Sequence, residues 1–197
     1  MTPPSACSLV LDGAGRIRFH HFGDEAYPEI ERTSQRLLGV HEDLVRVDAS
    51  GLAESADWRS LRSQETYVGL ARGERRIDTR TEGLALNQWT LSGDWSIGEE
   101  AAALHTTNGS IIYCFEARDL NMVLAPPVSG AHVRFDVRLN GKPPGDDHGL
   151  DIDASGSGVA AAPRMYQLVR LREPIRRQTF EITFHDPGVR AYVFTFG

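Results

Sequence analysis

The densest group of side chains able to do chemistry lies between residues 146 and 155. It begins with Asp146-Asp147-His148 and continues with Asp151, Asp153 and Ser155. Oxygen ligands in the order Asp-x-Asp-x-Ser are typical of calcium loops, but an EF-hand needs a glutamate at its twelfth position, which here is Ala162. Two alternatives stay open. One is a looser calcium or sugar site that uses His148 with these residues, and the other is a polar hairpin in which they only form turns.

A second candidate for ligand binding is the pair Trp89 and Trp95, which lie on either side of Gly93. A tryptophan ring beside a glycine turn could present its face to a sugar. Aromatic side chains at this spacing also fill protein cores. The sequence therefore predicts either a sugar platform or two core residues here.

The thiols and imidazoles do not form a complete catalytic set. Cys7 and Cys114 are far apart, each within an apolar run, and no Cys-x-x-Cys is present. This excludes a dithiol redox site or a four-cysteine zinc site within this sequence, and we expect both thiols to be buried. His20 and His21 are neighbours on an expected strand, so they point to opposite faces and cannot easily share a metal ion. We predict no catalytic residue and no cofactor for this chain.

The elements that would position these residues fall into three segments. Residues 1–45 are expected to form a strand at 7–11, a turn at 12–15, a returning strand at 16–22 and a helix that begins near Pro28 and ends at Gly39. This segment is too short to bury a core alone. Residues 46–66 are expected to be a linker with a short helix, anchored to a neighbouring element by Trp58 and Leu61.

Residues 67–197 are expected to form an antiparallel β-sandwich or jelly roll, because short apolar runs alternate with glycine-rich turns. Phe180, Ile182 and Phe184 alternate with polar residues, which places one face of that strand in the core. The expected strands are 66–70, 84–86, 89–91, 95–97, 101–104, 110–117, 121–124, 132–139, 159–161, 164–170, 179–184 and 191–196. The fold class is thus mainly β, preceded by a small α/β segment.

Composition narrows the classes of function. The chain is 41% hydrophobic and 24% charged, with a net charge of −6 that is spread along its length. These values argue against a general role in binding nucleic acid or a membrane surface. No apolar run is as long as a membrane span, and no secretory signal is visible. We therefore expect the chain as written to be cytoplasmic, or extracytoplasmic if a further segment precedes it.

Several runs of residues together resemble the DipZ-type redoxins. They span nearly the whole chain, and the combination is more specific than any single run. The runs are residues 19–27, 57–58, 65–69, 89–95, 117–120 and 194–197. In that family a thioredoxin-like domain precedes a β-sandwich similar to carbohydrate-binding modules, and some members add a membrane domain of the cytochrome c biogenesis type.

The resemblance implies that residues 1–45 correspond to the last part of a thioredoxin-like domain. The part that carries the redox cysteine pair in this family has no counterpart here, so no catalytic residue is carried over. We therefore expect a non-catalytic docking protein of the redoxin lineage, which binds a redox partner or pairs with a second copy through an exposed strand edge. Two alternatives are the C-terminal fragment of a thiol–disulfide oxidoreductase and an independent carbohydrate-binding module.

Overall fold

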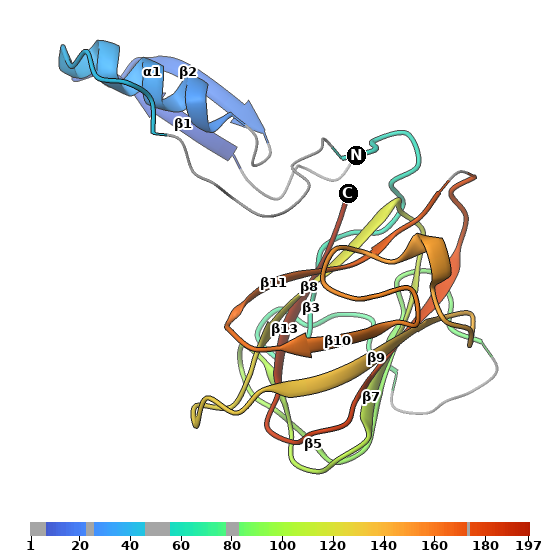
Figure 1. Cartoon of the computed structure of the whole chain (residues 1–197). Helices are drawn as coiled ribbons and strands as arrows, with labels where there is room; N and C mark the ends of the chain where they lie inside the picture. Colours follow the sequence, from blue (N-terminus) through green and yellow to red (C-terminus); the bar gives the residue numbers. More distant parts are fainter. Residues whose placement is uncertain (1–6, 23–25, 46–55, 78–82, 173) are drawn as a thin grey trace. The chain divides into compact units, whose positions relative to one another are not determined.

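The computed structural model describes residues 7–22, 26–45, 56–77, 83–172 and 174–197. The chain divides into two compact units, residues 1–55 and residues 56–197 (Figure 1). The boundary between them falls inside the segment that we expected to be a linker. Within the described residues, no helix is long and apolar enough to cross a membrane.

The first unit is a hairpin followed by a helix. Strands β1 (Cys7–Leu11) and β2 (Ile17–Phe22) pair antiparallel, and the Asp12 carboxylate accepts the backbone N–H of Ala14 and Arg16 in the turn between them. Helix α1 (Tyr27–Leu38) has a proline in its first turn. It ends at Gly39, whose left-handed φ of 67° suits glycine. The predicted strands and helix are confirmed here to within one residue.

This unit buries little apolar surface. No residue of α1 is buried, and Ala26 is the single buried residue among those of the unit whose burial is described. Leu9, Leu11 and Ile17 are 51%, 51% and 58% exposed. The expectation that so short a segment cannot bury a core is confirmed.

The second unit consists of two antiparallel sheets. The β7 sheet has the strand order β10-β9-β12-β7-β4, and the β13 sheet has the order β11-β8-β13-β6-β5, with β3 paired to Val193 and Phe194 of β13. The strands are β3 (Thr66–Tyr67), β4 (Trp89–Ser92), β5 (Trp95–Ile97), β6 (Ala102–Leu104), β7 (Gly109–Phe115), β8 (Asp119–Ala125), β9 (Val133–Leu139), β10 (Ser157–Ala160), β11 (Arg164–Arg170), β12 (Gln178–Phe184) and β13 (Arg190–Phe196). A 3-10 helix, η1 (Gly145–Asp147), lies in the connection between β9 and β10.

The core lies between the two sheets. Along β9 the residues alternate between buried and more exposed, and along β12 Phe180, Ile182 and Phe184 are fully buried as predicted. Aromatic rings join the layers, since Phe180 of the β7 sheet meets Phe194 of the β13 sheet edge-on at 6.0 Å. The β-sandwich predicted from the alternation is therefore confirmed.

The strand expected at residues 84–86 does not form. Asn87 has a left-handed φ of 65°, and its backbone N–H donates to the Cys114 carbonyl at 2.7 Å. The Gln88 side chain also accepts the N–H of Ala85 at 2.9 Å, which holds the chain in a turn. The run of three consecutive apolar residues predicted a strand, but the asparagine that follows them favours a turn.

Candidate functional site

The polar cluster around residues 146–155 lies on the loop that contains η1. His148 is exposed, and its Nδ1 lies 2.9 Å from the Gly149 carbonyl. Asp151 forms an ion pair with Arg164 at 2.5 Å and accepts the backbone N–H of Gln167 at 2.7 Å. The Arg164 guanidinium also stacks on the Tyr166 ring, 3.8 Å from its centroid. Asp151 is thus held by strand β11.

Asp153 belongs to a different network. Its carboxylate accepts the Ser155 hydroxyl at 2.5 Å and the backbone N–H groups of Ser155 and Ser157 at 2.8 and 3.1 Å. These hydrogen bonds, the one from the Ser155 hydroxyl first, lower the pKa of Asp153. The geometry is that of an aspartate that organises its own turn.

The predicted calcium ligands Asp151, Asp153 and Ser155 therefore do not converge. In the part of the chain that the structure describes, no three His, Cys, Asp or Glu side chains lie close enough together to hold a metal ion. Calcium at Asp151 would have to displace Arg164. This arrangement supports the turn-forming alternative.

Of the two candidate tryptophans, Trp89 lies in the interior and Trp95 packs at the edge of the core. Trp89 is 1% exposed, and its Nε1 donates to the Glu74 carbonyl at 2.8 Å. Trp95 is half-buried, donates to the Ser92 carbonyl at 3.0 Å and meets the Phe184 ring edge-on at 5.9 Å. Both rings support the core alternative, and Trp89 presents no face to a ligand.

The thiol that the structure describes, that of Cys114, shows no sign of activation. Cys114 is a free, buried thiol on β7, and burial raises its pKa above the ordinary value, which disfavours the reactive thiolate. The buried thiol predicted at Cys114 is confirmed. Cys7 begins β1, but its side chain lies outside the described residues. On β2, His20 pairs opposite Leu9 and His21 opposite Ser8, so the two imidazoles belong to opposite faces of the hairpin.

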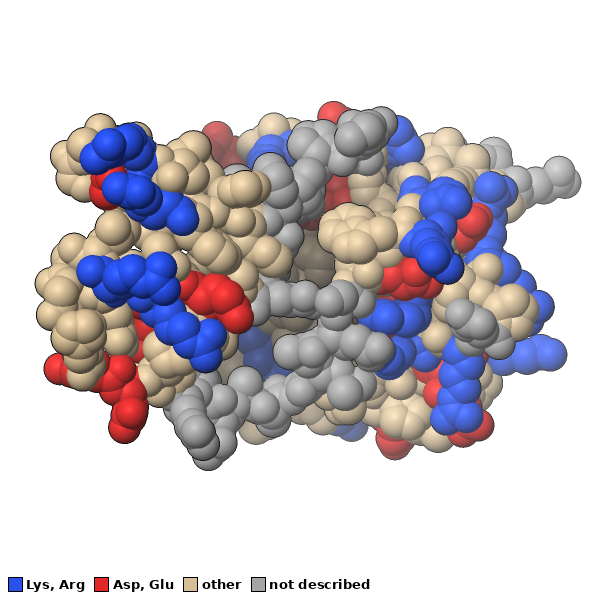
Figure 2. All heavy atoms as spheres, turned by 90° about the horizontal axis from the view of Figure 1, so that it is seen from above, with Lys and Arg blue, Asp and Glu red and all other residues tan. Residues whose placement is uncertain are grey.

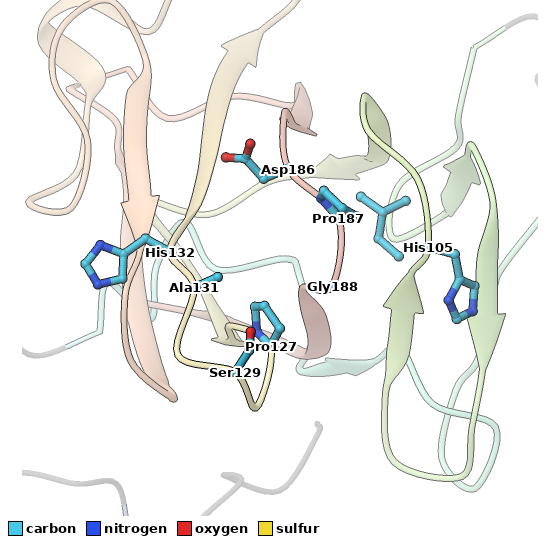
Figure 3. Close-up of a pocket in the computed structure, with 9 residues that line it drawn as sticks. His105, Pro127, Ser129, Ala131, His132, Asp186, Pro187 and Gly188 are labelled. Atoms are coloured by element: carbon cyan, nitrogen blue, oxygen red, sulfur yellow. The ribbon is translucent and has the colours of Figure 1, made fainter.

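A shallow depression of about 500 Å³ lies among the loops at one end of the sandwich (Figure 3). Its polar lining includes His105, His132 and Asp186. Figure 3 shows the two imidazole rings on opposite sides of the depression, pointing away from each other. The Asp186 carboxylate is held by the Arg134 guanidinium at 2.8 and 2.9 Å. These side chains therefore do not form a catalytic set.

Trp58, which the sequence singled out as an anchor, is instead exposed. Trp58 lies in a turn that the Asp57 carbonyl closes by accepting the N–H of Ser60 and Leu61 at 3.1 and 3.0 Å. The Asp57 carboxylate also accepts the Ser60 hydroxyl and the Arg59 N–H. Leu61 packs against the core as expected, but Trp58 is 62% exposed. The prediction that Trp58 anchors this segment is wrong, because the hydrogen-bonded turn fixes the backbone with the ring outside.

Arginines surround this turn. Arg62 donates its backbone N–H to the Glu116 carbonyl, and the N–H of Leu171 donates to the Arg118 carbonyl, so three distant segments meet at one end of the sandwich. In Figure 2, Lys and Arg side chains are numerous over this end of the second unit, at the right of the view. We call this surface the tryptophan–arginine end. It comprises Trp58, Arg59 and Arg62 of the turn and the arginines of the segments that meet it. These are Arg118, whose charge lowers the pKa of Asp57 in addition to the larger effect of the Ser60 hydrogen bond, Arg170 and Arg172 on either side of Leu171, and Arg176 and Arg177, which directly precede the pairing of Gln178 with Phe115.

The outer face of the β13 sheet carries a row of neutral polar side chains. Gln167 of β11 pairs opposite Asn121 of β8, which pairs opposite Thr195 of β13. The Asn121 amide donates to the Thr195 hydroxyl at 3.5 Å. All three side chains are half-buried. Planar amides and hydroxyls in one row are groups that hydrogen-bond to polyhydroxylated ligands.

Comparison with known proteins places this sandwich in a family. Residues 63–197 match the family described as "Thioredoxin like C-terminal domain". No curated protein matches the chain. The matching region is more than half of the 197 residues.

Similar solved structures include a family two carbohydrate esterase from Clostridium thermocellum in complex with cellohexaose. It is 10% identical with a TM-score of 0.43, and the match covers 55% of this chain and 31% of that one. An active-site mutant of such an esterase is 11% identical with a TM-score of 0.42, covering 56% and 31%. The match thus spans about a third of the length of these structures. Likeness at this level carries no conclusion about a ligand.

Proposed function

Because the chain belongs to the family of thioredoxin-like C-terminal domains, we propose that its β-sandwich is a non-catalytic docking module of the redoxin lineage. In this proposal the sandwich binds a redox partner, and residues 1–45 are the last part of a thioredoxin-like domain. The order of hairpin and helix in the first unit supports that assignment.

The observation that carries the proposal is the exposed Trp58 within a hydrogen-bonded turn. A large apolar ring held in solvent costs free energy unless a partner covers it. Tryptophan and arginine are the residues most enriched where binding energy concentrates in protein interfaces. A surface that combines them supports docking rather than chemistry.

The docking function can be tested by titration calorimetry. The 197-residue chain would be titrated with a thioredoxin-like oxidoreductase that carries Cys-x-x-Cys and is encoded in the same genome. We expect a one-to-one complex with a dissociation constant of about 1 μM, which corresponds to about −8 kcal/mol. Absence of binding at about 100 μM, in both redox states of the oxidoreductase, would refute docking to this class of partner.

The family membership also favours a second candidate for the whole protein. In it, the chain is the C-terminal part of a thiol–disulfide oxidoreductase of the DipZ or cytochrome c biogenesis type. The chemistry would be thiolate attack on a disulfide through a mixed disulfide, carried by residues outside this sequence. Reading the genomic DNA upstream of the Met1 codon tests this. An in-frame Cys-x-x-Cys would support it, and an in-frame stop codon without an intervening start would refute it.

The row of Gln167, Asn121 and Thr195 favours a third candidate, carbohydrate binding on the outer face of the β13 sheet. A panel of soluble hexasaccharides would be titrated into the chain. Binding that weakens at least tenfold in Asn121→Ala, with an unchanged melting temperature, would support this candidate. Thr183→Ala, on the other sheet, is the matched control. A panel without any binding would exclude these sugars as ligands.

A further inference from the structure

We propose that the tryptophan–arginine end binds an acidic segment of a partner protein, with an apolar side chain of that segment seated on the Trp58 ring. This inference names the chemistry of the partner and rests on the proposed docking function. It is carried by the geometry of the Trp58 turn and by the distribution of charge around it.

The Trp58 turn is ordered by its own hydrogen bonds. Five of them end on Asp57, three on its carbonyl and two on its carboxylate. The next residues are fixed as well, because Arg62 and Ser63 donate their backbone N–H to the Glu116 carbonyl at 2.8 and 3.1 Å. A backbone that is already fixed loses little conformational entropy when a partner covers the ring.

Several charged side chains around the turn form ion pairs with one another. Asp119 pairs with Arg118 at 2.6 Å and with Arg170 at 3.5 Å. Arg172 pairs with Asp146 at 3.1 Å, and its backbone N–H donates to Asp147 at 2.8 Å. These contacts use the carboxylates of Asp119, Asp146 and Asp147 within the chain itself.

The remaining arginines of this end have no such partner within the part of the chain that the structure describes. Among the described residues, no carboxylate forms an ion pair with Arg59, Arg62, Arg176 or Arg177, and all four are exposed. They stand on a chain whose net charge is −6. Such a local excess of positive charge attracts an acidic partner, and guanidinium groups can bind its carboxylates bidentately.

The occupant is therefore expected to be acidic and to carry an apolar side chain. Trp58 supplies an apolar ring that carboxylates alone would not cover, and this favours a protein segment over a polyanion without apolar groups. A peptide of sequence Glu-Glu-Leu-Phe-Glu-Glu is a suitable probe, with Lys-Lys-Leu-Phe-Lys-Lys as its control. A DNA duplex of matched charge represents the alternative of a simple polyanion.

The experiment measures binding of the labelled probes to the full chain by fluorescence anisotropy at two salt concentrations. We expect the acidic peptide to bind and the basic peptide not to bind, with affinity falling as salt rises. Trp58→Ala should weaken the acidic peptide at least tenfold, and Trp58→Phe should restore part of the loss. Binding of the duplex but not of the acidic peptide would overturn the proposal.

Charge reversal gives an independent test with a matched control. Arg59→Glu/Arg62→Glu should weaken the acidic peptide at least tenfold. Arg32→Glu/Arg36→Glu makes the same change in net charge on α1 of the first unit and should leave binding within twofold. Equal losses in both double variants would show that only net charge matters and would overturn a site at Trp58.

The same variants separate this inference from the docking function. If the Cys-x-x-Cys oxidoreductase binds equally well to the parent chain and to Trp58→Ala, the docking function stands, and the proposal that the tryptophan–arginine end is the binding surface is wrong. If the acidic peptide binds through Trp58 but the oxidoreductase does not bind, the surface stands and the redox partner is wrong. Strong protection of Trp58 from acrylamide quenching in the free chain, judged against Trp58→Phe, would show that the chain covers the ring itself and would overturn the proposal.

Discussion

The Tyr113 hydroxyl lies 2.8 Å from the Thr66 hydroxyl in the interior of the sandwich. The contact joins the first strand of the sandwich, β3, to β7, and the Asn87 amide oxygen also accepts from Tyr113 at 3.4 Å. Three segments that are distant in sequence thus share one buried polar cluster. Because buried polar groups are costly when unpaired, this cluster holds Thr66 and Asn87 against β7.

Removing the phenol should therefore destabilise the fold. Tyr113→Phe leaves the Thr66 hydroxyl and the Asn87 amide oxygen without this partner. We expect the free energy of unfolding to fall by about 1–2 kcal/mol. Urea denaturation would measure the loss, with the partly exposed Tyr192→Phe as control. Equal stability of Tyr113→Phe and the parent chain would contradict a structural role for this hydrogen bond.

Alkaline pH should unfold the sandwich through the same residue. Burial raises the pKa of Tyr113 to about 12. The phenol ionises near pH 10 in the unfolded chain but holds its proton in the folded one, so its contribution is complete below pH 10 and is lost as the pH rises toward 12. We expect the free energy of unfolding to fall by about 1.4 kcal/mol per pH unit in this window. In Tyr113→Phe this component of the decline should be absent.

Close backbone contact at Gly149 should make this glycine hard to replace. A Cβ added there would lie 2.2 Å from the Gln167 carbonyl oxygen, which is backbone and cannot turn aside. We expect Gly149→Ala to lower the melting temperature by several degrees, measured by circular dichroism. Gly98→Ala is the control, because its Cβ would meet nothing closer than 3.5 Å. Similar melting temperatures for the two variants would contradict the close packing of β11 on this loop.

The ion pair between Asp186 and Arg134 should be visible in a titration. Hydrogen bonds from the Arg134 side chain and backbone hold the pKa of Asp186 well below its ordinary value. Its small contribution to stability is therefore present at neutral pH and is lost as the pH falls. Carbon-detected NMR should place the Asp186 midpoint below that of an unpaired aspartate, and Arg134→Gln should raise it. An unchanged midpoint in that variant would exclude Arg134 as the cause.

The exposed hairpin of the first unit predicts association between copies. Within the described residues, β1 pairs with β2 alone, and Leu9, Leu11 and Ile17 are exposed. Sheet edges of this kind pair with other chains. We expect sedimentation velocity to show dimers at high concentration and Leu9→Lys to abolish them. A parent chain that stays monomeric at every concentration would contradict this prediction.

Much of the fold could be predicted because local chemistry and tertiary structure agree along most strands. The period of two in Phe180, Ile182 and Phe184 identified β12, and the glycine after Leu38 identified the end of α1. Strand β7 was predicted at 110–117 on a different signal, a continuous apolar run, since all seven of its residues are buried and it has no alternation.

The candidate site was less predictable, because exposure depends on contacts between distant segments. Trp89 and Trp58 are the same residue type in polar surroundings, yet the first is 1% exposed and the second 62%. The difference arises because the Glu74 carbonyl accepts a hydrogen bond from the Trp89 ring nitrogen, whereas the turn closed by Asp57 directs Trp58 outward. Nothing in the local sequence distinguishes these outcomes. The arginines likewise come together only when residues 56–62, 116–119, 170–172 and 174–177 meet.

The place of β13 in its sheet has a consequence for synthesis on the ribosome. This strand pairs with β8 on one side and with β6 and β3 on the other, although it follows all of them in the chain. The β13 sheet therefore stays open at its centre until residues 190–196 have left the exit tunnel. During that interval β8 and β6 expose apolar edges that other nascent chains could pair with. A pause in translation just before residue 190 would prolong this exposure, so the yield of folded protein should depend on elongation speed there.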